Sequence, residues 1–372
     1  MTPGLSAVIA DVVAPAATEV DRSGVFPRAG IEALGKAGLL GLTSATEVGG
    51  AGQGLAAAAQ AVTALAAACG STAMVTLMHY AAAAVIEAHG PDEVRRAIAR
   101  GEYLATLAFS ETGSRSHFWA PLGTATEHGG EVRLASRKSF VTAAGEADGY
   151  VWSSRSLTGR GPMTLWLVPD GTAGLSVSGA FDGLGLRGNA SSPMTADGVR
   201  PETMLGADGA GLDIALSTAL PTFLVLNAAF SLGVMDALVA GARAHVARTR
   251  LEHLGQTLAE QPGARSAFAR LAARRDQVRV FLNDVLAALE DGRDDAMLRV
   301  LQVKAVAAEA AVEIADEVMR LCGGSALRRD AGVERHFRDT LAARVMAPTT
   351  EALHDFAGRL AFGLPLLDGS GS

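Results

Sequence analysis

Aromatic residues are scarce in this sequence of 372 residues: Phe, Trp and Tyr together make up 5%, whereas hydrophobic residues of all kinds make up 49%. A core with so few rings has to be built from Ala, Leu and Val, and that composition suits closely packed helices. Cysteine is scarce too, because Cys69 and Cys322 are the only two. They lie far apart, with no CxxC spacing and no Cys/His cluster, so we expect neither a disulfide nor a metal site.

The sequence also lacks basic runs and long apolar runs. Its net charge is -7 and its pI is about 5.7, which excludes the basic footprint of a nucleic-acid-binding protein. The longest apolar segment, residues 74–86, is interrupted by Thr76 and His79 and is shorter than the roughly 20 residues of a membrane span. No basic leader precedes the first acidic residues, so a secretory signal is not supported. We therefore expect a cytoplasmic protein without a membrane span.

Hydrophobic periodicity divides the chain into three parts. Apolar residues recur at helical spacing from Leu5 onward, short β-rich runs replace this pattern from about Leu104, and helical periodicity returns after Gly211. Periodicity alone leaves open whether these parts are separate packed units or one α+β arrangement. We predict an N-terminal helical domain at residues 1–104, a central small β-sheet domain at 105–205, and a C-terminal helical domain at 206–372.

Short motifs recur along the whole chain in a recognisable order. They are EVGGAG at 47–52, LAFSETGSRSH at 107–117, RKSFVT at 137–142, LGLRGN at 184–189, LGADGAG at 205–211, LCGG at 321–324 and the pair Arg338-Asp339. Their order and spacing resemble the acyl-CoA dehydrogenase superfamily from end to end. The resemblance implies an FAD-dependent oxidoreductase with the family's α+β multidomain fold. In that fold a helical domain, a small β-sheet domain and a C-terminal four-helix bundle follow one another.

Four residues of the central motifs are implied to contact the flavin ring. Phe109 and Ser110 would lie at its pyrimidine edge, where a backbone or hydroxyl group can hydrogen-bond the ring. Phe140 would flank the isoalloxazine, and Thr142 would place its hydroxyl near N5. A hydroxyl can satisfy the polar edge of such a ring, so the residue types suit the implied roles.

Another set is implied to contact the phosphates or the adenine of FAD. Ser116 would meet the diphosphate, whereas Gly323, Gly324 and Thr349 would approach a phosphate or the adenine, in family members often across a subunit interface. Glycines allow backbone amides to come close to a phosphate. The resemblance therefore also implies a homo-oligomer, either a homodimer or a homotetramer.

The family's catalytic glutamate is missing, because its position near the C-terminus holds Ala347. A base for the α-proton of a thioester must lie within hydrogen-bond reach and have a suitable pKa, and alanine offers no proton acceptor. Some family members supply the glutamate from an earlier helix, but the matching residues 219–223 contain no acid. Glu351, one helical turn beyond Ala347, would share a face with it. It is the candidate for the catalytic base, although a solvated glutamate or helix cap is the commoner role.

Three functions remain open. The first is α,β-dehydrogenation of an acyl thioester, carried by CoA or an acyl carrier protein, with a displaced base or an unusually acidic α-proton and an external electron acceptor. The second is a flavin-dependent monooxygenase of the same fold, which needs no such base but requires a flavin reductase. The third is a catalytically degenerate partner subunit that completes the FAD site of a homologous dehydrogenase. Arg115 and His117, which replace a glycine and an aspartate of the family motif, favour this third function.

Overall fold

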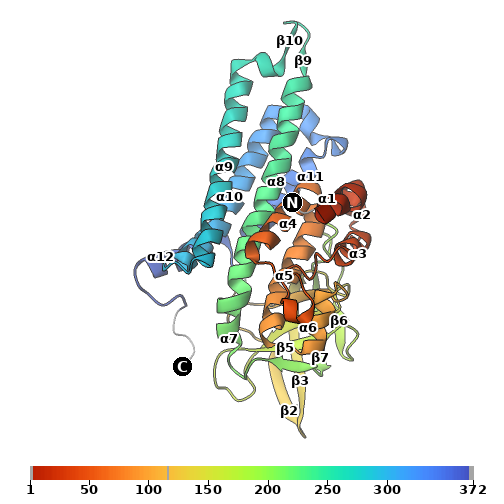
Figure 1. Cartoon of the computed structure of the whole chain (residues 1–372), viewed down its shortest axis with the longest axis vertical. Helices are drawn as coiled ribbons and strands as arrows, with labels where there is room; N and C mark the ends of the chain where they lie inside the picture. Colours follow the sequence, from red (N-terminus) through yellow and green to blue (C-terminus); the bar gives the residue numbers. More distant parts are fainter. Residues whose placement is uncertain (1–2, 115–116, 368–372) are drawn as a thin grey trace.

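The computed structural model describes residues 3–114 and 117–367 and places helices at both ends of the chain around a small β domain. In Figure 1 the long C-terminal helices stand upright, the N-terminal helices pack along one side, and the β domain lies at the bottom. This arrangement confirms the predicted order of a helical part, a small sheet part and a second helical part. We keep 1–104, 105–205 and 206–372 as the proposed domain boundaries.

The N-terminal part is organised around one long buried helix, α5 (Gly70–His89). Nearly every residue of this helix as far as Ile86 is buried, and a helix that is apolar all round belongs in a core. It packs against α4, β1 and α8. The remaining N-terminal helices are α1 (Pro3–Val8), a π-type turn (Ile9–Val13), α2 (Ala14–Ser23), α3 (Arg28–Lys36), a 3-10 turn (Thr46–Val48), α4 (Leu55–Ala68) and α6 (Asp92–Ala99).

The β domain consists of two four-stranded sheets. The first has the strand order β1-β4-β5-β8, with β1 parallel to β4 and the other pairs antiparallel. The second has the order β2-β3-β7-β6 and is antiparallel throughout. The strands are β1 (Ala105–Ala108), β2 (Thr124–His128), β3 (Glu131–Val141), β4 (Gly149–Ser154), β5 (Thr164–Pro169), β6 (Leu175–Val177), β7 (Ser192–Val199) and β8 (Thr203–Leu205).

The C-terminal part is a bundle in which α8, α9, α10 and α11 pack against one another, with α12 against α10. The hairpin β9 (Arg250–Leu251) and β10 (Gln256–Thr257) connects α8 to α9. The other elements are α7 (Gly211–Ile214), a π-type turn (Ala215–Ala219), α8 (Leu220–Arg248), a 3-10 turn (Leu258–Glu260), α9 (Pro262–Glu290), α10 (Ala296–Cys322), two more 3-10 turns (Gly323–Leu327 and Arg329–Ala331), α11 (Val333–Val345) and α12 (Thr350–Ala361).

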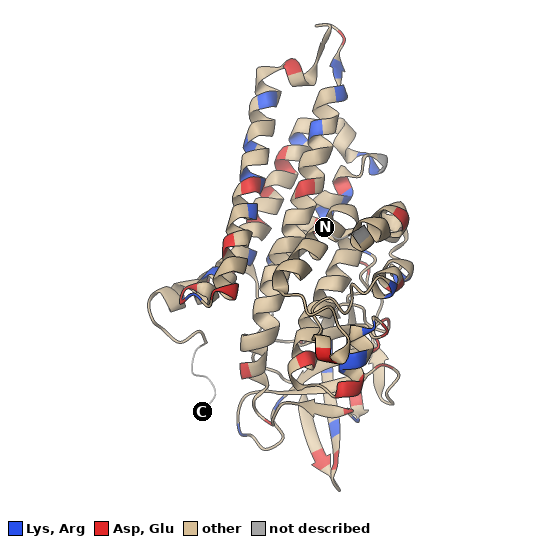
Figure 2. Cartoon of the chain, viewed as in Figure 1, with Lys and Arg blue, Asp and Glu red and all other residues tan. Residues whose placement is uncertain are grey.

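One helical stretch, Gly211–Arg248, is long and apolar enough by length and composition to cross a membrane. However, 83% of its most apolar window is buried inside the protein, as expected for the central helix of a bundle. Acidic and basic residues both occur along the upper parts of α8, α9 and α10 (Figure 2). For example, Arg279 on α9 contacts both carboxylate oxygens of Asp236 on α8, at 2.6 and 2.7 Å. A cytoplasmic location remains the prediction.

Candidate active site

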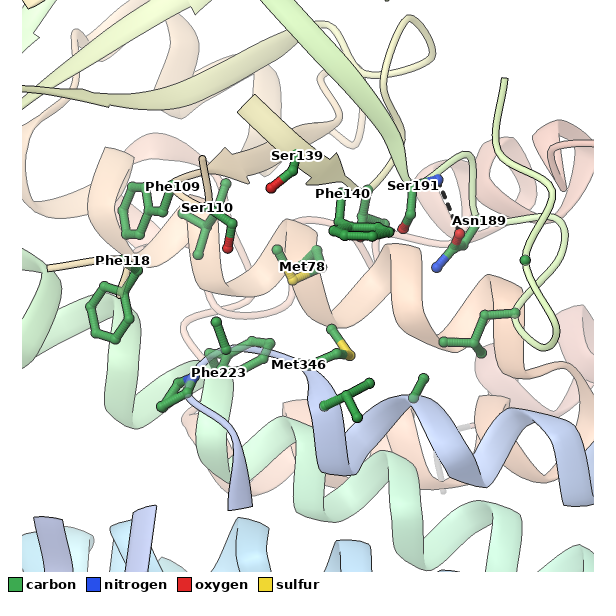
Figure 3. A pocket seen from close by; sticks show the side chains of 18 of the residues that line it. Met78, Phe109, Ser110, Phe118, Ser139, Phe140, Asn189, Ser191, Phe223 and Met346 are labelled. Carbon is green, nitrogen blue, oxygen red and sulfur yellow. Dashed lines mark hydrogen bonds between the residues drawn. The ribbon is translucent and has the colours of Figure 1, made fainter. Parts of the chain in front are cut away.

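A cavity of about 960 Å³ lies where the β domain meets helices α5, α8 and α11. Its walls come from segments far apart in the sequence, and Figure 3 shows their side chains converging on one space. Ligand pockets in proteins run from about 300 to about 1,000 Å³, so a bulky cofactor or substrate fits. The cavity brings together four of the predicted flavin-site residues and the position of the missing base: Phe109, Ser110, Phe140, Thr142 and Ala347.

One wall of the cavity carries neutral hydrogen-bonding groups. The hydroxyl oxygens of Thr142 and Ser191 are 3.1 Å apart, and the Asn189 side chain accepts a hydrogen bond from the backbone N–H of Ser191 at 3.1 Å. Ser110 and Ser139 add two hydroxyls to this wall (Figure 3). Such groups bind polar atoms without carrying a charge, which suits the edge of an uncharged ring. We missed Asn189 and Ser191 in the sequence, although Asn189 ends the LGLRGN motif.

Phe140 presents its ring to the same space. Its exposed fraction is 74%, although it lines the cavity, and its φ is +52°. The pairing of β3 with β7 is irregular between Lys138 and Val141, and a bulge of this kind re-aims a side chain. A positive φ is unfavourable for a residue other than glycine. The surrounding fold therefore holds this ring in an exposed position, where a flat ligand would cover it.

The other side of the cavity is apolar. Met78 on α5, Phe223 on α8 and Phe118 face it (Figure 3). Pro221 in the first turn of α8 has no N–H to donate, and the chain makes the π-type turn Ala215–Ala219 just before it. Turns of the π type are often found at functional sites. Ala215 and Ala219, the first and last residues of this turn, line the cavity. Their small side chains leave room for an apolar ligand group.

A buried ion pair lies beneath the polar wall. Glu111 lines the cavity, and its Oε1 accepts a hydrogen bond from Lys138 Nζ at 2.6 Å, while its Oε2 accepts from the backbone N–H groups of Leu122 and Gly123 at 2.5 and 2.9 Å. Lys138 Nζ also donates to both oxygens of Ser153. Burial lowers the pKa of Lys138 to about 8, against the opposing effect of Glu111. Both oxygens of Glu111 are therefore engaged, and this residue holds the loop at Leu122 and Gly123 rather than offering a base.

Ala347 lines the cavity, but Glu351 does not. The chain leaves helical conformation after Val345, the end of α11, and begins α12 at Thr350. Glu351 is therefore not one turn beyond Ala347 on a single helix, and that expectation was wrong. The Glu351 side chain is exposed, and hydrogen bonds from its own backbone N–H and from Thr349 lower its pKa. A base for an α-proton needs the opposite environment, so the structure lends no support to Glu351 as the base.

Three of the predicted phosphate or adenine contacts, Gly323, Gly324 and Thr349, do not line the cavity. Gly323 and Gly324 begin the 3-10 turn that follows α10, and both are exposed. Thr349 is the N-cap of α12 and accepts a hydrogen bond from the backbone N–H of Ala352 at 3.4 Å. Ser116 lies outside the described residues. The phosphate and adenine roles of these four residues remain predictions.

Two adjacent side chains on α11 hold the loop that closes the cavity beside the β domain. Asp339 Oδ1 accepts a hydrogen bond from the backbone N–H of Leu186 at 2.7 Å, and Arg338 Nη1 donates to the Leu184 carbonyl at 2.9 Å. Arg338 also pairs with Asp21 at 2.6 Å, which links α11 to α2. Burial raises the pKa of Asp339 to about 7. The sequence contained this Arg-Asp pair as a motif, but only the fold reveals its partners.

Replacing Asp339 by Asn is expected to alter the pH dependence of stability. The pKa of Asp339 is about 7 in the folded state and about 3.9 in the unfolded chain. Between these two pH values, Asp339 is protonated in the folded protein but ionised in the unfolded chain. Its contribution to the free energy of unfolding therefore falls as pH rises from about 4 to about 7. Asn keeps an acceptor for Leu186 but carries no charge. In urea denaturation, the stability of Asp339→Asn relative to the parent should rise by on the order of 1–3 kcal/mol between pH 5 and pH 7.5. An unchanged difference would contradict the raised pKa.

Comparison with known proteins identifies the family of this chain. Sequence models of the acyl-CoA dehydrogenase N-terminal, middle and C-terminal domains match residues 4–102, 106–199 and 209–361. The chain belongs to the acyl-CoA dehydrogenase family. Among curated relatives, the short-chain specific acyl-CoA dehydrogenase of Clostridium acetobutylicum is 25% identical over 348 residues, covering 91% of each chain.

Solved structures share the fold of this acyl-CoA dehydrogenase family member. Butyryl-CoA dehydrogenase from Megasphaera elsdenii has a TM-score of 0.90 and 21% identity, covering 97% of this chain and 99% of its own. The prolyl acyl carrier protein oxidase AnaB has a TM-score of 0.86 and 18% identity, covering 97% of this chain and 99% of its own. These likenesses confirm the predicted fold, with its N-terminal helical domain, small β-sheet domain and C-terminal bundle.

The predicted cofactor is confirmed at the level of the family, whose members are FAD-dependent oxidoreductases. The cavity fits the flavin ring of FAD, because a wall of neutral donors and acceptors lies beside an exposed aromatic ring. Phe109, Ser110, Phe140 and Thr142 are the predicted residues that would hold the ring there. Their individual roles remain predictions.

Proposed function

We propose that this family member dehydrogenates an acyl thioester between its α and β carbons. The supporting observation is that one cavity combines the neutral polar wall and Phe140 ring with an apolar wall and the position of the family base. The thioester would be carried by CoA, as in the names of the curated relatives, or by an acyl carrier protein, as in the name of the AnaB neighbour.

The residues of the cavity would divide the work. When bound, FAD supplies the two-electron oxidant for the β carbon. Met78, Phe118 and Phe223 would hold the acyl chain and exclude water from the reacting bond, which strengthens every hydrogen bond inside the site. The hydroxyls of Ser110 and Thr142 would orient the cofactor, so that substrate and oxidant meet in one geometry.

Removal of the α-proton has to proceed without the usual glutamate. Among the described residues that line the cavity, Glu111 is the one carboxylate, and both its oxygens accept hydrogen bonds. A substrate with an ordinary α-proton would react slowly at such a site, because a positioned base contributes about 10²–10⁴-fold to a proton transfer. We therefore propose a substrate whose α-proton is acidified by a second electron-withdrawing group.

The proposal includes partners outside the chain. An external electron acceptor would reoxidise the cofactor after each turnover. A homodimer or homotetramer would bring Gly323, Gly324 and Thr349 of one copy toward the cofactor of another, which accounts for the exposure of the two glycines outside the cavity. We also propose that the protein is cytoplasmic.

A flavin-dependent monooxygenase is the second candidate. It is favoured by the same observation that weakens dehydrogenation, namely a cavity with Ala347 at the base position and no unengaged carboxylate among its described lining residues. Oxygenation needs no α-proton base. It needs space beside the cofactor, which alanine provides, and an external flavin reductase.

An anaerobic titration separates these candidates. The purified holoprotein would be mixed with saturated acyl thioesters of different length and branching, including some with an electron-withdrawing group next to the α carbon, while the visible flavin band is recorded. We expect bleaching, fastest with the acidified thioesters. A flavin band that no thioester bleaches, but that a reductase with NAD(P)H does, would favour the monooxygenase. A purified chain without flavin would favour the degenerate partner subunit.

A further inference from the structure

A fully buried lysine lies directly behind the position of the missing base. Lys304 is on α10 and is 0% exposed, and α10 packs against α8, α11 and α12. Burying an ammonium group is unfavourable unless strong hydrogen bonds compensate for the lost water. Burial accordingly lowers the pKa of Lys304 to about 7. A lysine kept in such a place calls for a specific role.

The hydrogen bonds of Lys304 go to the two carbonyl groups on either side of Ala347. Nζ donates to the Met346 carbonyl at 2.8 Å and to the Pro348 carbonyl at 2.7 Å. Residues 346, 347 and 348 all line the cavity, and they lie in the short link between α11 and α12. The last carbonyls of a helix have no partner within that helix. Lys304 therefore supplies bonds that neither helix can give, and it supplies them from the far side of the cavity wall.

A second buried side chain approaches the same link. The amide nitrogen of Asn227 on α8 lies 3.8 Å from the Met346 sulfur, and Asn227 is 0% exposed. Neither Lys304 nor Asn227 is among the residues that line the cavity. Both thus act on the 346–348 segment from behind, and the lysine makes the shorter bonds.

We propose that Lys304 is a positioning residue that fixes the 346–348 segment as a wall of the cavity. With alanine at 347, this segment contributes no catalytic side chain, so what it provides is the place of its backbone and of the Met346 side chain beside the apolar pocket (Figure 3). A displacement of about 1 Å at such a wall can lower a rate about 10²-fold. The catalytic part of this inference rests on the proposed function, whereas the structural part does not.

Hydrogen–deuterium exchange measured by mass spectrometry tests the structural part. In the Lys304→Met holoprotein, peptides that cover residues 341–352 should exchange at least tenfold faster than in the parent, with exchange in the β domain unchanged. Lys304→Arg, which keeps the charge and the donors, should restore much of the protection. The matched control is Arg344→Gln. It removes a half-exposed ion pair between Arg344 on α11 and Glu309 on α10, but it removes no bond to the 346–348 segment.

The outcomes separate the inference from the proposed function. Unchanged exchange at 341–352 in folded Lys304→Met, or the same change in Arg344→Gln, would overturn the positioning role whatever the enzyme does. If Lys304→Met does not fold, Lys304→Gln, whose shorter stem withdraws the donor, carries the same test. With a thioester that bleaches the flavin, we further expect kcat to fall at least tenfold, KM to change less than threefold, and Lys304→Arg to recover part of kcat. If no thioester reacts, the exchange result still decides the positioning role.

Discussion

Replacing Lys138 by Met is expected to lower the free energy of unfolding by about 3–5 kcal/mol, the usual result of breaking a buried ion pair from one side. The side chains of Lys138 and Glu111 are 0% and 2% exposed, so water cannot compensate the abandoned carboxylate. Urea denaturation followed by tryptophan fluorescence measures the effect where it arises, since Lys138 Nζ lies 5.3 Å from the centroid of the Trp152 ring. Because Glu111 lines the cavity, flavin should also be lost.

Two further variants make this prediction specific. Adding Glu111→Gln to Lys138→Met removes the abandoned charge while keeping an acceptor for the backbone N–H groups of Leu122 and Gly123, so the double variant should recover at least half of the loss. Arg133→Gln on the same strand breaks an ion pair with Glu131, and the side chains of Arg133 and Glu131 are 45% and 44% exposed. This variant should change the free energy of unfolding by less than about 1 kcal/mol. If Lys138→Met is as stable as Arg133→Gln, the buried ion pair of Lys138 and Glu111 does not stabilise the loop at Leu122 and Gly123.

The fold was predictable from the sequence because its signals are local. Apolar periodicity predicts long helices such as α8 and α10. Short β-rich runs between glycine-rich turns predict the β domain. The motif order then supplied the arrangement of the three parts. The RKSFVT motif also pointed to Phe140 and Thr142, and the bulged end of β3 with the residue after it brings both to the cavity, although their roles remain predictions.

The remaining site residues depend on contacts that no local pattern reveals. Lys304 reads as an ordinary residue of an amphipathic helix, yet its bonds reach residues more than forty positions away. Asp339 likewise gains its role from a loop and a helix that meet only in the fold, because it accepts its hydrogen bond from Leu186. The expected placement of Glu351 beside Ala347 was wrong for a local reason, because helical spacing was assumed across residues 346–349, where α11 has ended and α12 has not begun.

Replacing Ala347 by Glu is expected to raise the rate of thioester-driven flavin bleaching by about 10² or more, the contribution of a positioned general base. Position 347 faces the cavity, so a carboxylate there would be next to a bound acyl group. Lys304 Nζ, which bonds the carbonyls of both neighbours at 2.8 and 2.7 Å, would favour the ionised form of that glutamate. Anaerobic stopped-flow mixing with the best thioester of the panel measures the rate, and the gain should be largest for thioesters without an acidifying group.

Ala347→Gln is the matched control for this gain of function, because it adds the same volume without a proton acceptor. If Gln and Glu both slow the reaction, the added volume obstructs the substrate, and the alanine serves to make space. If Glu accelerates bleaching and Gln does not, proton removal limits the parent enzyme, and the site is a dehydrogenase site that lacks only its base. If thioesters bleach the flavin of neither the parent nor the two variants, the missing carboxylate is not what prevents dehydrogenation. The space at Ala347 then favours the monooxygenase, whose chemistry never required the base.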